Sequence, residues 1–206
     1  MPRVDQIITL PDTPDVGPLR LGPADDGRIV TAEEFATAEY AEPWQYERVE
    51  GRLYVLSPEG KFHVRTSTPW LLRLSAYALA HPEQIQAVVP SPWVRVSPTT
   101  DRIGDIGVYL GGTLDNLNLP DQVPDLLFEF VSPAKQDRLR DYDTKRAEYE
   151  RVGVREYVIV DRFDRKVTVL TLADGKYAER VIEADGKYES PLLPGLAIGL
   201  AEAGPG

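Results

Sequence analysis

Hydrophobic and polar residues alternate along several short stretches of this chain, with the period of two that is typical of β-strands. The stretch 125–131 differs, because both of its faces are hydrophobic apart from Glu129. One face carries Leu126, Phe128 and Phe130, and the other carries Leu127, Glu129 and Val131. The pattern therefore predicts a central strand that is buried on both sides.

The remaining strand candidates are short and follow one another closely. Residues 46–56 form two strand-like runs around Glu50-Gly51, which is the pattern of a hairpin. Asp174-Gly175 and Asp185-Gly186 are two further hairpin signals. The other predicted strands cover residues 85–89, 93–96, 105–110, 154–160, 166–170 and 177–182.

Three stretches have the hydrophobic spacing of helices. Thr31 and Glu34 form a capping-box pattern that predicts a short helix over 32–38. A longer helix is predicted over 62–80, where Pro69 must either start the helix proper or kink it. A charged helix over 136–152 is predicted to end at Gly153.

Residues 1–28 contain five prolines and show no period, so we expect a surface arm or a disordered leader there. No internal repeat and no linker divides the rest. We therefore predict a single domain over 29–206, of α/β (α+β) class, with a mixed sheet and few helices.

Glu129 is the first candidate for chemistry, because a buried carboxylate needs a cation: a metal, a lysine or an arginine. The alternative is a strand end at which the carboxylate reaches water. The predicted helix over 136–152 offers a partner, since Lys145 falls inside its packing arc and Arg146 near the edge of that arc. The arc consists of Leu139, Tyr142, Tyr149 and Val152.

The helical wheel alone does not choose between Lys145 and Arg146. Asp141 precedes Lys145 by four residues and could steady it through an i, i+4 pair. Lys145 could instead extend along the helix edge into water. Asp105 opens the next candidate strand, a position where aspartate is often only a turn residue.

Two carboxylates on successive strands and a lysine on the following helix suit phosphodiester hydrolysis. Hard oxygen ligands hold Mg²⁺ or Mn²⁺. Such a metal polarises the phosphate, and the lysine orients the nucleophile or offsets developing charge. Asp105, Glu129 and Lys145 are therefore the candidate catalytic residues.

Composition and charge exclude several classes. The chain has 206 residues, of which 42% are hydrophobic, and its Gly and Pro content is too low for a fibrous protein. It has no cysteine and only two histidines, which excludes thiolate chemistry and a histidine-rich zinc site. A net charge of −10 disfavours broad nucleic-acid binding, so any such contact needs a local patch. There is no membrane-spanning run and no signal-peptide pattern, and we expect a cytoplasmic protein.

Several blocks of the chain resemble a bacterial family of putative restriction endonucleases, mostly uncharacterised, within the PD-(D/E)XK nuclease superfamily. The resemblance spans about residues 30–200. Its central blocks are Asp105, Glu129-Phe130-Val131-Ser132-Pro133, Asp141-x-x-x-Lys145-x-x-x-Tyr149 and the run Gly153–Asp161. Its flanking blocks are Thr31–Phe35, Tyr46–Gly51, Ser57-Pro58, His63 and Ser190–Leu196.

The resemblance implies a restriction-endonuclease-like core, which is a mixed central sheet flanked by helices, here with additional hairpins. It implies that Asp105 and Glu129 hold Mg²⁺ or Mn²⁺. The usual superfamily lysine position, two residues after the glutamate, is Val131 here, and the family supplies Lys145 instead. By the same resemblance, Glu47 is a further metal ligand and His63 lies near the site, with Asp141 and Tyr149 in support.

The chain departs from the family pattern at two positions. Gly104 stands where the family usually has proline before its aspartate, which changes how the strand entry is held. Pro69 interrupts a helix that is continuous in relatives, which could shift His63. Neither change removes a candidate catalytic group.

Three functional hypotheses follow. The first is a Mg²⁺-dependent endonuclease acting on DNA, in which a homodimer could form the nucleic-acid groove. The second is a catalytically silent nuclease fold that serves as a binding or scaffold module. In the third, Glu129 and Lys145 are only a buried salt bridge and Asp105 is a turn residue.

Overall fold

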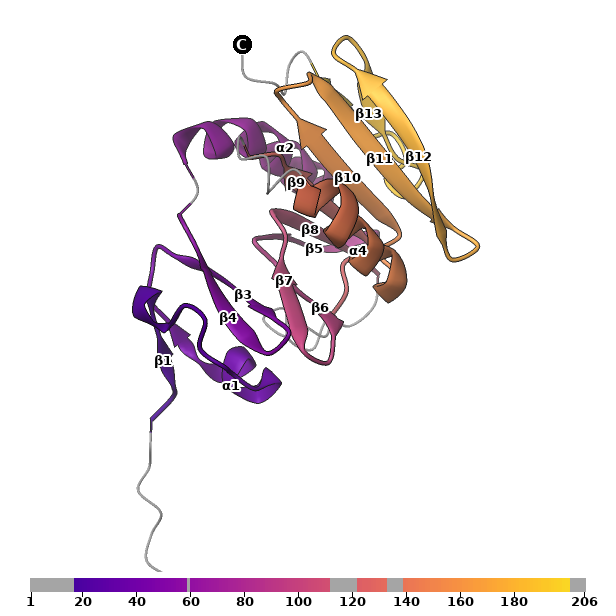
Figure 1. The fold of residues 1–206 in the computed structure, drawn as a ribbon. Coiled ribbons are helices and arrows are strands. Elements are labelled where there is room, and N and C mark those ends of the chain that lie inside the picture. Colours follow the sequence, from indigo (N-terminus) through magenta and orange to yellow (C-terminus); the bar gives the residue numbers. More distant parts are fainter. Residues whose placement is uncertain (1–16, 59, 112–121, 133–138, 201–206) are drawn as a thin grey trace, which may run out of the picture.

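The computed structural model describes residues 17–58, 60–111, 122–132 and 139–200. Two larger sheets and two helical segments make up most of this part (Figure 1). The predicted helix over 136–152 lies partly outside the described residues. So does the predicted N-terminal arm, but its later part is packed: β1 pairs in parallel with β2, and Leu21 is buried.

The larger sheet has six strands in the order β12-β11-β10-β9-β8-β5. β9 and β10 are parallel and every other pair is antiparallel, so the sheet is mixed as predicted. Its strands are β5 (Ile85–Pro90), β8 (Ile106–Leu110), β9 (Leu126–Phe130), β10 (Glu156–Asp161), β11 (Lys166–Ala173) and β12 (Lys176–Glu183). All five residues of β9 are buried, which confirms the central strand.

The second sheet has four antiparallel strands in the order β4-β3-β7-β6. They are β3 (Gln45–Val49), β4 (Arg52–Leu56), β6 (Trp93–Ser97) and β7 (Thr100–Ile103). The hairpin predicted over 46–56 is confirmed as β3 and β4, with Glu50 and Gly51 both at positive φ in the turn. β7 was not predicted.

Smaller elements complete the described chain. They are β1 (Arg20–Leu21), the 3₁₀ turn η1 (Pro23–Asp25), α1 (Ala32–Thr37), β2 (Glu39–Tyr40), β13 (Lys187–Glu189) and β14 (Ala197–Gly199). The capping box before α1 is confirmed, since Thr31 and Glu34 exchange backbone-to-side-chain hydrogen bonds of 2.7 and 3.1 Å.

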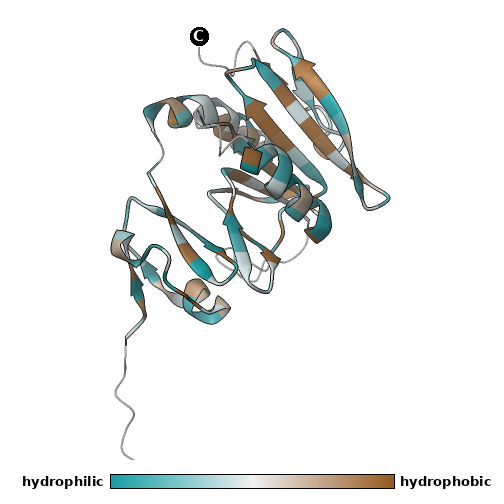
Figure 2. Ribbon diagram, in the orientation of Figure 1, coloured by the Kyte–Doolittle hydropathy of each residue, from teal (hydrophilic) through white to brown (hydrophobic). Residues whose placement is uncertain are grey.

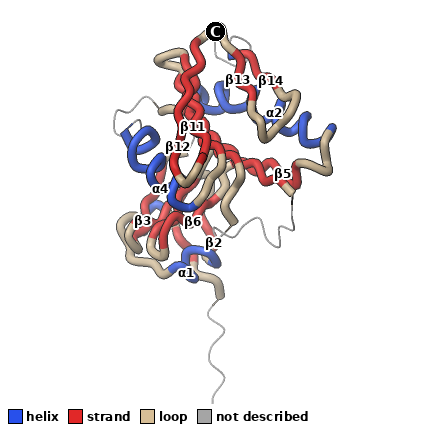
Figure 3. Tube along the Cα trace, turned by 90° about the vertical axis from the view of Figure 1, so that its right-hand side faces the viewer, coloured by secondary structure: helices blue, strands red, loops and turns tan. Residues whose placement is uncertain are grey.

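Helices cover the six-stranded sheet on both faces. α2 (Lys61–Ala80) packs Trp70, Leu74 and Tyr77 on one face, against Phe128 and Phe130 among others. α4 (Arg146–Val152) packs Tyr149 on the opposite face, against Leu127 and others. Figure 3 shows α4 and α2 on either side of β11 and β12, and in Figure 2 hydrophobic residues run along the strands between them. Because side chains alternate along a strand, Glu129 points to the α4 face.

One local prediction was wrong. Asp185-Gly186 does not form a hairpin, because β13 pairs with β14 rather than with β12. A side chain at Gly186 would collide with Ile182, so this glycine allows a close approach. Of the two alternatives for Pro69, the structure excludes the helix start, since α2 begins at Lys61 and runs through Pro69.

Candidate active site

Asp105, Glu129 and Lys145 line one pocket of about 390 Å³. Asp105 lies between β7 and β8, Glu129 lies on β9, and Lys145 ends the π-helical segment η2 (Arg140–Lys145) that leads into α4. Three elements far apart in the sequence therefore meet at one place. Lys145 Nζ lies 2.7 Å from Glu129 Oε1.

Of the two cations that the helical wheel left open as partners of Glu129, the structure places Lys145 against it. Lys145 is buried, whereas Arg146 forms an exposed pair with Glu179 at 2.7 Å. The wheel placed Leu139 in the packing arc, and this was wrong, because Leu139 is 53% exposed. A π-helical segment turns less per residue than an α-helix, so a wheel drawn at α-helical pitch misplaces residues beyond it.

Lys145 is held by oxygen atoms from several elements. Its ammonium group donates to the Ile103 carbonyl at 2.9 Å and to Glu129 at 2.7 Å. Carboxylate oxygens of Glu47 and Asp141 each lie 3.8 Å away. Burial lowers the pKa of Lys145, but these carboxylates outweigh it, so the pKa lies above its ordinary value. Lys145 therefore stays charged while buried.

The surroundings favour the charged form of Lys145 but disfavour the charged form of Glu129. Burial raises its pKa to about 8, the Lys145 charge opposes that rise, and the neighbouring carboxylates of Asp105 and Asp141 add to it. Among the described residues, the hydrogen bonds to Glu129 come from Lys145 and from the Tyr149 hydroxyl at 3.3 Å, and both go to Oε1. A carboxyl group in this setting favours the arrival of further positive charge.

Asp105 is fixed at the entry to β8. Its Oδ2 accepts a 2.6 Å hydrogen bond from the Phe130 backbone N–H, which ties it to the end of β9. Its Oδ1 lies 3.4 Å from His63 Nε2. His63 is in the first turn of α2 and lines the same pocket, so Pro69 does not remove it from the site.

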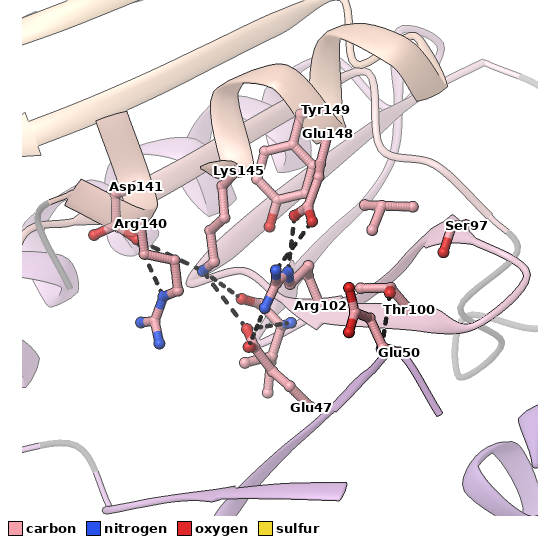
Figure 4. A network of polar contacts seen from close by, with 12 residues as sticks. Glu47, Glu50, Ser97, Thr100, Arg102, Arg140, Asp141, Lys145, Glu148 and Tyr149 are labelled. Atoms are coloured by element: carbon pink, nitrogen blue, oxygen red, sulfur yellow. Dashed lines mark hydrogen bonds and ion pairs between the residues drawn. The ribbon is translucent and has the colours of Figure 1, made fainter. Parts of the chain in front are cut away.

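Glu47 lies behind the pocket rather than in its lining. Its carboxylate accepts from Arg102 at 3.0 Å and from the Ile103 N–H at 3.2 Å (Figure 4). Burial raises the pKa of Glu47, but Lys145 and Arg102 outweigh it and the pKa lies below its ordinary value. The structure brings Glu47 within reach of Lys145 and engages its carboxylate with Arg102.

The sequence analysis missed Arg102, whose guanidinium also donates to both carboxylate oxygens of Glu148, at 2.8 and 3.0 Å. The missed strand β7 carries it. Arg140, which lines the pocket 3.8 Å from Asp141, was also missed. For Arg102, the sequence offers only the polar run Thr100-Asp101-Arg102, a pattern that predicts a loop.

The pocket's donor set fits a hard divalent cation. Among the described residues, no group of three or more histidines and carboxylates is placed to hold a metal. Mg²⁺ does not need one, because it is commonly bound through one or two carboxylates while it keeps several waters. Asp105 and Glu129 supply two carboxylates to one pocket, and within the part of the chain that the structure describes the hydrogen bonds of Glu129 engage Oε1 rather than Oε2.

Comparisons with known proteins identify the family of the chain and a similar fold. Residues 32–201 match the model of the Uma2 family, described as "Putative restriction endonuclease". The fold is similar to that of a crystal structure of a putative nuclease belonging to DUF820 from Anabaena variabilis, with a TM-score of 0.67 and 16% sequence identity. That similarity covers 84% of this chain and 97% of the other. No curated protein matches the chain.

Proposed function

The chain belongs to the Uma2 family of putative restriction endonucleases, and on that premise we propose that it is a metal-dependent endonuclease that hydrolyses phosphodiester bonds in DNA. The observation that supports this best is the meeting of Asp105, Glu129 and Lys145 in one pocket. Two carboxylates and a charged lysine are the groups that this reaction needs.

Asp105 and Glu129 would hold Mg²⁺ or Mn²⁺. Such an ion, when bound, polarises the phosphate and lowers the pKa of a bound water. Lys145 carries its charge into the pocket, where it stabilises the negative charge that develops on the phosphate oxygens. Because Lys145 is held by the Ile103 carbonyl and by Glu129, it is oriented before any substrate arrives.

The supporting residues act through these three. Tyr149 donates to Glu129 and so orients that carboxylate. Asp141 and Glu47 help to keep Lys145 charged, each from 3.8 Å. His63 faces Asp105 across 3.4 Å and can donate a hydrogen bond to it or to a phosphate oxygen. Glu47 is better supported as a positioning residue than as a metal ligand, because its carboxylate binds Arg102.

A second function is favoured by one specific observation. The Lys145–Glu129 pair is a close buried contact of 2.7 Å, and a buried ion pair of this kind also occurs in the core of proteins without catalytic function. Val131, at the usual superfamily lysine position, is buried in the hydrophobic cluster under α4. A nuclease fold that binds without cutting is therefore the alternative.

Metal binding tests the site itself. Titration calorimetry with Mn²⁺ and Mg²⁺ is expected to show saturable binding by the wild type, and loss of that binding in both Glu129→Gln and Asp105→Asn. Asp125→Asn is the matched control, since Asp125 pairs with exposed Arg155 outside the pocket and its variant should bind as the wild type does.

Absence of wild-type binding at millimolar metal would contradict the proposed function. Cleavage of plasmid DNA in Mn²⁺ separates the two candidate functions. A nuclease converts supercoiled DNA to nicked or linear DNA, and Glu129→Gln does not, whereas a scaffold leaves the DNA intact even where metal binds.

A further inference from the structure

Two exposed phenylalanines and an arginine lie together beside the candidate active site. The Arg162 guanidinium carbon is 5.3 Å from the Phe62 ring centroid and 4.4 Å from the Phe163 ring centroid. Phe62 is 52% exposed and Phe163 is 43% exposed. We call Phe62, Arg162 and Phe163 the aromatic–arginine cluster. Large exposed aromatic rings are costly to leave in water, so such a cluster is a candidate contact surface.

The cluster is held in place from both sides. Phe62 lies in the first turn of α2, next to His63. Arg162 and Phe163 lie in the turn between β10 and β11, where Asp161 Oδ1 accepts from the N–H groups of Phe163 and Asp164 at 2.9 and 3.0 Å. These bonds fix the backbone of the turn that carries Arg162 and Phe163, while α2 fixes the backbone of Phe62.

A small pocket of about 150 Å³ lies between the cluster and the catalytic pocket. It is smaller than the pockets that enclose whole drug-sized ligands, and its size suits a fragment such as one planar ring system. Four residues line the small pocket but not the catalytic pocket: Phe62, Thr66, Val131 and Arg162. Both pockets are lined by Gly60, His63, Phe130 and Ser132. A ligand in one pocket is therefore adjacent to a ligand in the other.

The cluster also carries positive charge. Lys61 is the residue before Phe62, and its Nζ lies 5.4 Å from the Phe62 ring centroid. Within the described part of the chain, neither Lys61 nor Arg162 forms an ion pair. This is a local cationic patch on a protein whose net charge is −10. It meets the requirement that any nucleic-acid contact here must be local.

We propose that the small pocket and the aromatic–arginine cluster bind one unstacked nucleobase of the substrate strand, while Lys61 and Arg162 bind its phosphate. This inference rests on the proposed nuclease function and adds a substrate class to it. Unstacked bases stack on aromatic rings and on guanidinium planes, and stacking does not depend on base identity. A base in a duplex has both faces covered, so the favoured substrate is single-stranded DNA or a duplex from which one base is extruded.

Fluorescence anisotropy with labelled oligonucleotides in EDTA tests this, because without metal no cleavage interferes. The probes are a single-stranded 12-mer, its blunt duplex, and the same duplex with one unpaired base. The wild type should bind the single strand and the bulged duplex more tightly than the blunt duplex. Phe62→Ala and Phe163→Ala should each weaken single-strand binding about tenfold, as expected when a stacking ring is lost. Arg162→Lys, which keeps the charge and removes the plane, should weaken it in the same direction.

Leu79→Ala and Arg155→Ala are the matched controls, since Leu79 is exposed at the far end of α2 and Arg155 is a cation outside both pockets. Equal losses for single-stranded and blunt-duplex probes would overturn the proposal in favour of a charged patch alone. Wild type that binds no probe at low salt would overturn it too. If only the single strand or only the bulged duplex binds more tightly than the blunt duplex, that result shows whether the bound base comes from a free strand or is extruded from a duplex.

The failures of the two proposals are distinguishable. If the wild type binds metal and cuts DNA, and Phe62→Ala cuts single-stranded and bulged DNA at the wild-type rate, the nuclease function stands and the base pocket is refuted. If the wild type neither binds metal nor cuts DNA, the nuclease function fails, whatever the binding titrations show.

Discussion

Lys145 balances the charge of three carboxylates at once, since its ammonium nitrogen lies within 3.8 Å of Glu129, Glu47 and Asp141. Glu47 has Arg102 as a second cation, and Asp141 has Arg140. Among the described residues, Glu129 has only Lys145 within ion-pair distance. Loss of Lys145 therefore forces buried Glu129 either to take up a proton or to stand as an uncompensated charge.

The Lys145–Glu129 pair predicts a strongly non-additive mutant cycle. Lys145→Met should lower the free energy of unfolding by about 3 kcal/mol or more, because it leaves buried Glu129 without its cation. Adding Glu129→Gln to that variant should restore part of the loss, since the stranded charge is then removed. Urea unfolding of the wild type, both single variants and the double variant measures the coupling.

An exposed ion pair provides the control for this cycle. Lys176 pairs with Glu150 at 2.8 Å, and its side chain is largely exposed, so Lys176→Met should change the stability by less than about 1 kcal/mol. Additive losses in the Lys145 and Glu129 cycle would show that the two groups do not stabilise each other.

At the level of elements, the hydrophobic pattern predicted the strands and helices that are packed by hydrophobic side chains. β9 was predicted because its residues are hydrophobic on both faces, and α1 because its capping residues are adjacent in sequence. β7 was missed because buried ion pairs hold it: Asp101 binds Arg48 at 2.6 Å and Arg95 at 2.8 Å. Polar residues that pair across strands leave no hydrophobic signature along one strand.

Gly104 makes a testable contribution to the entry of β8. Its N–H donates to the Pro92 carbonyl at 3.0 Å, a bond that proline could not make. A Cβ at this position would lie 2.6 Å from Cδ1 of Leu127, which is fully buried. Gly104→Ala should therefore cost about 1–3 kcal/mol through overpacking.

Combining Gly104→Ala with Leu127→Val should recover part of that cost, because the shorter side chain vacates the contested space. Thermal unfolding of the two single variants and the double variant measures this. A Gly104→Ala protein as stable as the wild type would show that Leu127 can move freely, contrary to its close packing.

For the molecule as a whole, the candidate site exists only where separate layers meet. Asp105 follows the four-stranded sheet, Glu129 belongs to the six-stranded sheet, and Lys145 lies on the helical layer. The residue types were readable from the sequence, and the family resemblance ordered them. Their mutual distances were not readable, because they depend on how two sheets and a helix dock.

The C-terminal strands are joined to the large sheet by a buried carboxyl group. Glu156 on β10 accepts hydrogen bonds from the Tyr188 hydroxyl at 2.5 Å and from the Ser190 hydroxyl at 3.0 Å. Burial raises the pKa of Glu156 above its ordinary value of 4.5, although both hydroxyl donors act against the rise. The folded chain therefore binds this proton more tightly than the unfolded chain does.

This raised pKa predicts a pH dependence of stability. The contribution of Glu156 is fully present below pH 4.5 and is lost as the pH rises through the higher folded-state pKa. Glu156→Gln stays neutral, so its free energy of unfolding should improve relative to the wild type as the pH rises above 4.5. Urea unfolding across that range tests this, with exposed Glu189→Gln as the control. A difference between Glu156→Gln and wild type that does not change with pH would contradict it.

The π-helical segment before α4 has an evolutionary consequence. Deleting one residue from a helical segment rotates the side chains on one side of the deletion about the helix axis, by about 100° where the helix is α-helical. A single deletion within Arg140–Lys145 would therefore rotate either Asp141 or Lys145 away from the pocket, even though every residue type of the site survived. Substitutions on the outer side of this segment are tolerable, but insertions and deletions are not. We therefore expect the length of this segment, as much as its composition, to be constrained wherever the site is in use.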